Sequence, residues 1–182
     1  LVYMSDATTR KDFSVLKNAE IALLKAVDLK PDYTAAHFLL AQVFDAEGNQ
    51  NEAIRRSEAA ALLAPNDIGS LFQLGLLYYK NNRLEEARSV LERAILINDN
   101  YSNARYFLGL TFDKQNKKAD AIVQFEKISS LNPGNGEVKR ILMNLRSGKS
   151  ALSSIVPPAQ APDKRTEPPV KEIKETPAPS GR

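Results

Sequence analysis

The sequence predicts an all-α protein, built as a solenoid of stacked antiparallel helix pairs. The first observation is a helical hairpin in residues 68–101, where two stretches with apolar residues at helical spacing flank a turn at Asn82. The second observation is that this hairpin pattern recurs with a fixed period of 34 residues. Two helices in a unit of this length are typical of a stacked solenoid.

Several kinds of residue mark the 34-residue period. Prolines close three of the units, at Pro31, Pro65 and Pro133. Asp99 stands at the corresponding position of the unit that has no proline. Alanines keep the interval in the second helices, at Ala19, Ala53, Ala87 and Ala121. Small residues stand in the first helices at Ala41, Gly75 and Gly109, with an aromatic one turn later at Phe44, Tyr78 and Phe112. A glycine inside a helix costs about 1 kcal/mol relative to alanine, so Gly75 predicts a closely approaching partner helix.

The helix ends follow from turn chemistry. The prolines of LKPDY, LAPND and LNPGN each stop a helix, because the residue before proline disfavours helical backbone. The connection INDNY relies on Asn and Asp instead, and the turns inside the pairs fall at Gly48, Asn82 and Asn116. An amphipathic last helix ends near Gly148. The predicted helices cover residues 14–29, 34–46, 51–63, 68–81, 85–97, 102–115, 119–131 and 137–146.

At these residues the chain resembles the tetratricopeptide repeat family, over roughly residues 1–147. The resemblance implies a right-handed superhelical solenoid whose first helices line a concave side that binds extended peptides or helices. Two features depart from the family pattern. His37, Leu71 and Arg105 stand at its opening aromatic position, and Asp99 replaces the closing proline of the central unit, so we expect that turn to be less rigidly set.

These patterns divide the chain into four parts. Residues 1–33 are predicted to be a partial first repeat, with a truncated first helix ending near Tyr3 and a long turn, which favours a fragment of a longer protein. Three repeats follow at 34–67, 68–101 and 102–133, and then a capping helix at 134–148. Residues 149–182 hold seven of the ten prolines and are predicted to be a disordered tail, in which Val170 and Ile173 are candidates for a short binding motif.

Composition leaves little room for catalysis or metal binding. The chain has no cysteine and one histidine, His37, which we expect to pack in the core or at its boundary. Glu85 and Glu86 open a helix, where acidic residues favour the positive end of the helix dipole. We therefore expect no enzyme activity, no metal and no cofactor. A net charge of +3 with interspersed signs argues against nucleic acid, and no apolar run approaches the ~18 residues of a membrane span.

A binding surface remains. Residues opposite the buried face of the first helices form a predicted partner-binding groove: Phe38, Gln42, Asp45, Phe72, Leu76, Tyr79, Tyr106, Leu110 and Asp113. The alternative is that its aromatic rings pack laterally between neighbouring first helices. Family members that grip a C-terminal carboxylate use basic residues, and none stands at the matching positions here: Phe38, Gln42, Gln73, Asn103 and Phe107. Capture of a terminal carboxylate is therefore disfavoured.

The sequence thus predicts a protein–protein interaction scaffold that binds a peptide or helix of a partner in a largely apolar groove. Two alternatives stay open. One is an accessory module of an enzyme or membrane-embedded parent whose catalytic part lies upstream. The other is self-association, in which the N-terminal edge stacks on a second copy to form a homo-oligomer. The compartment also stays open between the cytoplasm and the soluble part of a membrane-anchored protein.

Overall fold

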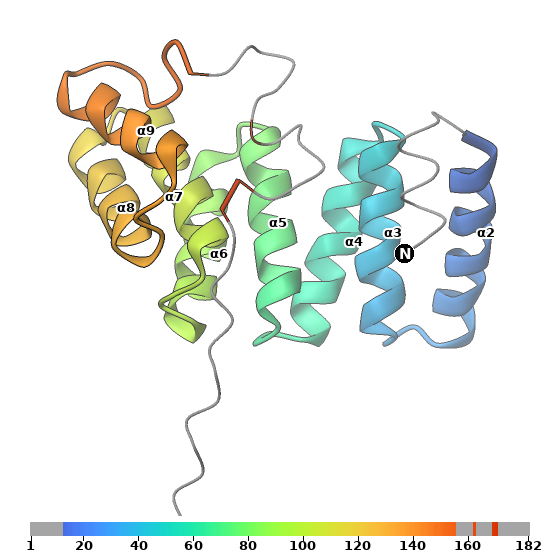
Figure 1. The fold of residues 1–182 in the computed structure, drawn as a ribbon. Coiled ribbons are helices and arrows are strands. Elements are labelled where there is room, and N and C mark those ends of the chain that lie inside the picture. Colours follow the sequence, from blue (N-terminus) through green and yellow to red (C-terminus); the bar gives the residue numbers. More distant parts are fainter. Residues whose placement is uncertain (1–12, 156–161, 163–168, 171–182) are drawn as a thin grey trace, which may run out of the picture. The chain divides into compact units, whose positions relative to one another are not determined.

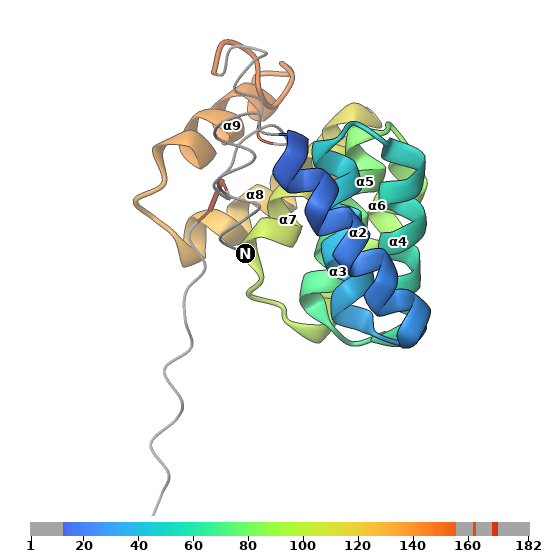
Figure 2. The same ribbon diagram turned by 90° about the vertical axis from the view of Figure 1, so that its right-hand side faces the viewer.

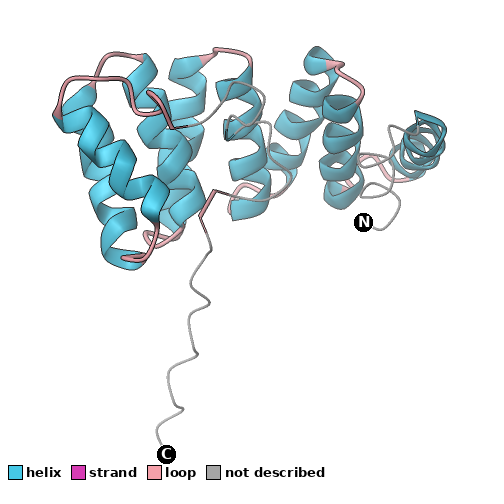
Figure 3. Ribbon diagram, turned by 45° about the horizontal axis from the view of Figure 1, so that its top comes forward, coloured by secondary structure: helices cyan, strands magenta, loops and turns pink. Residues whose placement is uncertain are grey.

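A computed structural model describes residues 13–155, 162 and 169–170, and these residues form helices and loops without any strand (Figure 3). The helices are α2 (Phe13–Leu29), α3 (Thr34–Ala46), α4 (Gln50–Leu63), α5 (Ile68–Lys80), α6 (Leu84–Ile97), α7 (Ser102–Lys114), α8 (Lys118–Leu131) and α9 (Gly136–Arg146). Each predicted boundary lies within one residue of the observed one, and the all-α class is confirmed. The predicted truncated helix and long turn before residue 13 lie outside the described residues.

The chain divides into two compact units, residues 1–97 and residues 98–182. In the first unit, α3 pairs with α4 and α5 with α6, while α2 packs against α3 (Figures 1 and 2). The predicted close crossing of α5 and α6 is confirmed. A Cβ atom added at Gly75 would stand 2.7 Å from Cγ of Leu91, whose side chain is fully buried. Ala87 and Ala94, also fully buried, let α6 approach at the same face.

The second unit contains α7, α8 and α9, with α8 packed against both of the others. Its helix crossing repeats the arrangement of the first unit, because a Cβ atom at Gly109 would stand 2.6 Å from Cε2 of Phe125. The whole of α7 from Ser102 to Phe112 is buried. Chain beyond α8 contributes to this burial, because Glu137, Ala151 and Val170 each form a hydrogen bond with a residue of α7.

Left-handed residues follow four of the described helices, as the sequence predicts. Gly48, Asn82 and Asn116 close the turns inside the pairs with φ of 78°, 58° and 60°. Gly148, with φ of 78°, follows α9. Asn is one of the few residues other than glycine that adopts this conformation at modest cost, which explains its use at two of the turns.

Asp99, at the position of the missing proline, anchors an ion network within the second unit. Its backbone carbonyl accepts a hydrogen bond from Nε of Arg105 at 2.7 Å, and its carboxylate pairs with the same guanidinium. Lys127 Nζ lies 2.7 Å from the other carboxylate oxygen. The hydrogen bond from Lys127 and the charge of Arg105 lower the pKa of the Asp99 carboxyl. Ion pairs thus hold this turn where the other units use a proline ring.

Residues 149–155 do not form the solvated start of a disordered tail. Asn144 on α9 donates its side-chain amide to the carbonyls of Ala151, at 3.0 Å, and Ser153, at 2.8 Å. The N–H of Ala151 donates to the Asp113 carboxylate at 2.8 Å, and Ala151 is fully buried. The prediction of disorder is wrong for these residues, because side chains of α7 and α9 satisfy backbone groups that composition alone assigns to water.

Candidate functional site

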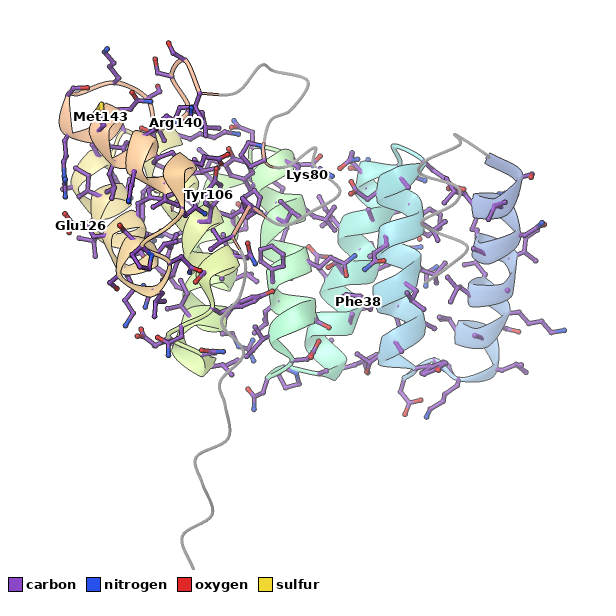
Figure 4. The ribbon with its side chains drawn as sticks, viewed as in Figure 1. Phe38, Lys80, Tyr106, Glu126, Arg140 and Met143 are labelled. Carbon is purple, nitrogen blue, oxygen red and sulfur yellow. The ribbon has the colours of Figure 1, made fainter. Side chains whose placement is uncertain are left out.

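Part of the predicted groove lies on α3 and α5 of the first unit. Phe38 and Phe72 are half-buried, as are Gln42 and Leu76 one turn later. The carbonyl of Phe38 accepts a weak hydrogen bond from Gln73 on α5, at 3.4 Å, so the two first helices are joined at this level. Figure 4 shows the Phe38 side chain between α3 and α5. These side chains therefore combine lateral packing with partly accessible apolar surface.

The polar edge of this face is paired within the molecule. Lys80 at the end of α5 reaches Asp45 on α3, with Nζ 2.6 Å and 2.9 Å from the two carboxylate oxygens. Gln50 also donates to Asp45, at 3.1 Å. Tyr79, predicted to lie at the same edge, is only 4% exposed. The accessible part of the face in the first unit therefore includes the apolar side chains of Phe38, Phe72 and Leu76 beside Gln42, and the nearby charges of Lys80 and Asp45 are paired.

The second unit does not expose its share of the predicted groove. Tyr106 and Leu110 on α7 are 0% and 2% exposed. The Tyr106 hydroxyl donates to the carboxylate of Glu137 on α9, and its ring meets Phe125 edge-on with centroids 5.4 Å apart. The expectation of exposed side chains at these two positions is wrong. Tyr106 contacts Glu137 on α9 and Phe125 on α8, which leaves it no exposed surface.

Asp113, the third predicted groove residue on α7, is committed to its own unit. Its carboxylate accepts from Nζ of Lys118 at 3.0 Å and from the N–H of Ala151. Lys118 also donates to the carbonyl of Lys149, at 3.0 Å. In this structure Asp113 therefore fixes the segment that follows α9 rather than standing open to a partner.

The residue of α7 with the most informative contact is Asn103, which the groove prediction does not include. Its Nδ2 donates to the carbonyl of Val170 at 3.0 Å, and its Oδ1 accepts from the N–H of Val170 at 3.1 Å. A primary amide presents the same donor and acceptor as a peptide unit, so Asn103 pairs with Val170 as an adjacent β-strand would. Both residues are buried, with 3% and 1% exposure.

A second asparagine supports the same segment. Asn135 caps α9 through Oδ1, which accepts from the N–H groups of Glu137, at 3.0 Å, and Val138, at 3.1 Å. Because the cap uses only Oδ1, Nδ2 of Asn135 is free to donate a hydrogen bond to the carbonyl of Pro169, at 3.4 Å. Figure 1 shows the short red segment 169–170 beside α7. Asn103 on α7 and Asn135 before α9 thus bind the backbone of two consecutive residues, Pro169 and Val170.

Among the residues that the structure describes, no group of three or more His, Asp or Glu side chains is placed to hold a metal ion. His37 is 7% exposed and donates from Nε2 to the carbonyl of Pro31 at 2.8 Å, as a boundary histidine would. No helix within the described ranges is long and apolar enough to cross a bilayer.

A shallow hollow of about 790 Å³ between α8 and α9 is lined by Glu126, Lys139, Met143 and Arg146, among others. An ion pair of 2.8 Å between Arg146 and Glu126 spans it, and Figure 4 shows Glu126 and Met143 at this end of the second unit. This ion pair engages the one carboxylate of the lining, Glu126.

Comparison with known proteins gives two matching family models. One describes subunit 3 of the anaphase-promoting complex (cyclosome) and matches residues 14–94; the other describes the tetratricopeptide repeat and matches residues 72–135. No curated protein matches the chain.

Solved structures share the fold. MamA is 24% identical over 82% of this chain and 88% of that chain, with a TM-score of 0.70. YrrB, described as a TPR protein with an unusual peptide-binding site, is 21% identical over 83% and 80%, with a TM-score of 0.68. A tetratricopeptide repeat protein from Parabacteroides merdae is 21% identical over 80% and 59%, with a TM-score of 0.69. At these identities the likeness shows the fold alone.

Proposed function

Because this chain belongs to the tetratricopeptide repeat family, we propose that it is a protein–protein interaction scaffold that binds an extended peptide segment on its first helices. The observation that carries the proposal is the pairing of the Asn103 amide with both backbone groups of Val170. A buried amide that offers a donor and an acceptor side by side is costly to leave unpaired, so it favours a site that is filled by a peptide backbone.

The first unit has an apolar face of its own, which we propose as a second contact surface for a partner. Phe38 and Phe72 present partly accessible rings, and the neighbouring Asp45 and Lys80 neutralise each other. Aromatic anchors in a face of this kind commonly account for about 2 kcal/mol or more each, which is roughly thirtyfold in affinity. Binding through such anchors depends weakly on salt, because long-range charge contributes little.

The test measures affinity for a partner that a pull-down with this chain recovers, at low and high ionic strength. We expect Phe38→Ala and Phe72→Ala each to weaken binding roughly thirtyfold while the helical content is retained. Leu96→Ala is the matched control, because Leu96 is 85% exposed on α6, a second helix. If the two aromatic variants bind like the parent while added salt abolishes binding, the apolar-face proposal is wrong.

The remaining alternative with a direct test is self-association through α2. Light scattering over a range of protein concentrations distinguishes a monomeric scaffold, which keeps a constant mass, from a chain that dimerises. A mass that doubles with concentration, together with no binding of the recovered partner, would replace the scaffold proposal by self-association.

A further inference from the structure

The sequence of the segment that Asn103 holds restricts its backbone to few conformations. Pro168 precedes a proline, which disfavours helical backbone at that position, and Pro169 has a fixed φ and no N–H to leave unsatisfied. Val170 is β-branched and favours extended backbone. Because few conformations are lost when such a segment binds, its ordering costs less than that of an average peptide.

The site also selects which backbone groups of a ligand it can hydrogen-bond. Asn103 uses one donor and one acceptor on the same residue, while Asn135 reaches the carbonyl of the residue before it. The Val170 side chain is 1% exposed, so it occupies an enclosed position that a charged side chain could enter only at a large desolvation cost. Pro162, earlier in the tail, is also buried.

We propose that Pro169–Val170 is a resident ligand of the α7 face, and that the partners are internal peptide segments with a proline before a β-branched residue, which bind by displacing it. This inference rests on the function proposed above and names its partner class and its regulation. The carbonyl that Asn103 binds belongs to a peptide bond within the chain, so the site recognises an internal segment rather than a free C-terminus.

The Asp99 network agrees with this partner class. The two cations of the Asp99 network, Arg105 and Lys127, are engaged by Asp99, and Arg105 is also hydrogen-bonded to Gln124 at 2.7 Å. An acidic ligand would gain little from cations that are already paired. Amide-to-backbone hydrogen bonds, together with burial of one aliphatic side chain, are then the main source of affinity.

Competition follows because the resident segment is part of the same chain. A ligand linked to its site has an effective concentration of order millimolar, whatever the protein concentration. If the segment binds the site with an intrinsic dissociation constant of about 0.1 mM, its presence in the chain lowers the apparent affinity for the same peptide added in solution by about tenfold.

The experiment uses the full chain and a fluorescent synthetic peptide of residues 166–174, TEPPVKEIK. Val170→Asp in the protein places a charge in the enclosed position and releases the tail, so we expect this variant to bind the peptide about tenfold more tightly than the unaltered chain. Asn103→Ala should bind the peptide weakly, whether or not the protein also carries Val170→Asp. The Asn103 side-chain amide resonance, followed by nuclear magnetic resonance, should shift in Val170→Asp and return toward its original position when peptide is added.

Val123→Asp is the matched control, because Val123 is 57% exposed on α8 and the same substitution there leaves the site intact. A peptide with aspartate in place of Val170 should bind none of the proteins. If the Asn103 resonance is the same in Val170→Asp as in the unaltered chain, the tail is not a resident ligand and the proposal fails. If the resonance shifts while peptide affinity does not change, competition is refuted.

The function proposed above is judged separately, by the effect of Phe38→Ala and Phe72→Ala on the recovered partner. Loss of partner binding in those variants together with no response to Val170→Asp would retain the scaffold and reject the resident ligand. The reverse result would retain the tail contact and reject the apolar face of the first unit. Far-ultraviolet circular dichroism of Asn103→Ala checks that its weak binding does not come from unfolding.

Discussion

The substitution Gly75→Ala tests the close crossing of α5 and α6. A methyl group at this position would stand 2.7 Å from both Cγ and Cδ2 of Leu91, well inside the ~3.5–4.0 Å of an ordinary carbon contact. Cγ is the branch point of a fully buried side chain and not its flexible end, so the helices or the Leu91 rotamer must shift to make room.

Two opposing effects set the magnitude. Alanine favours the helix over glycine by about 1 kcal/mol. Overpacking of a tight core costs about 1–3 kcal/mol, so we expect a net loss of about 1 kcal/mol in the free energy of unfolding. For a protein of this size such a loss lowers the thermal midpoint by ~2–4 °C. Gly69→Ala in the same helix is the control. Its nearest neighbour would be an Asp67 oxygen at 3.5 Å, so this variant should be stabilised by up to about 1 kcal/mol.

A double-mutant cycle in urea unfolding makes the test sharper. Leu91→Ala alone should cost about 2–5 kcal/mol, because it leaves a cavity against Gly75. In that background Gly75→Ala should become stabilising, since its methyl group enters the vacated space. If Gly75→Ala stabilises the unaltered chain as much as Gly69→Ala does, or if the two changes are additive, then contact with Leu91 is not the reason for the glycine.

Two further predictions concern the turns. Asp99→Asn should lower the urea midpoint at neutral pH by the equivalent of at most about 1 kcal/mol, because the exposed carboxylate loses its ion pairs. Since the pKa of Asp99 is lowered in the folded state, its contribution is present above the ordinary value of 3.8 and is lost as the pH falls through the lowered pKa, so the two midpoints should converge in acid. Asn82→Ala, at a φ of 58°, should cost about 1–2 kcal/mol in thermal unfolding, whereas Asn82→Gly should be close to neutral; equal midpoints for both would contradict the left-handed turn.

The sequence predicts well what depends on local spacing. Helix ends follow from Pro31, Pro65 and Pro133 and from the Asn and Gly turns, because these residues restrict backbone conformation wherever they occur. The Gly75 crossing is predictable for a similar reason: an unfavourable residue that recurs at one interval in first helices needs a partner at that position. Both inferences depend on interactions within about one repeat, and each pattern recurs in several units of the 34-residue period.

The burial of Tyr106 and the role of Asn103 could not be predicted in the same way. Helical spacing places Tyr106 on the face of α7 opposite the predicted buried face, but it cannot say that Glu137 on α9 will accept a hydrogen bond from its hydroxyl. Asn103 and Val170 are 67 residues apart, and neither belongs to a repeated pattern that would relate them. Val170 stands out in the sequence as an aliphatic residue within a charged, proline-rich run. A single chain offers no signal for where such a residue binds.

The same separation of 67 residues has a consequence for protein synthesis. Helices α7, α8 and α9 can pair with their neighbours soon after they leave the ribosome, whereas the contact to Val170 must wait for a far later stretch of chain. At ~5–20 residues per second this interval lasts roughly 3–13 s. During that time Asn103 is made but its resident segment is not. A partner that is present at the ribosome therefore meets the α7 face without a competitor, and a partner that arrives after release does not.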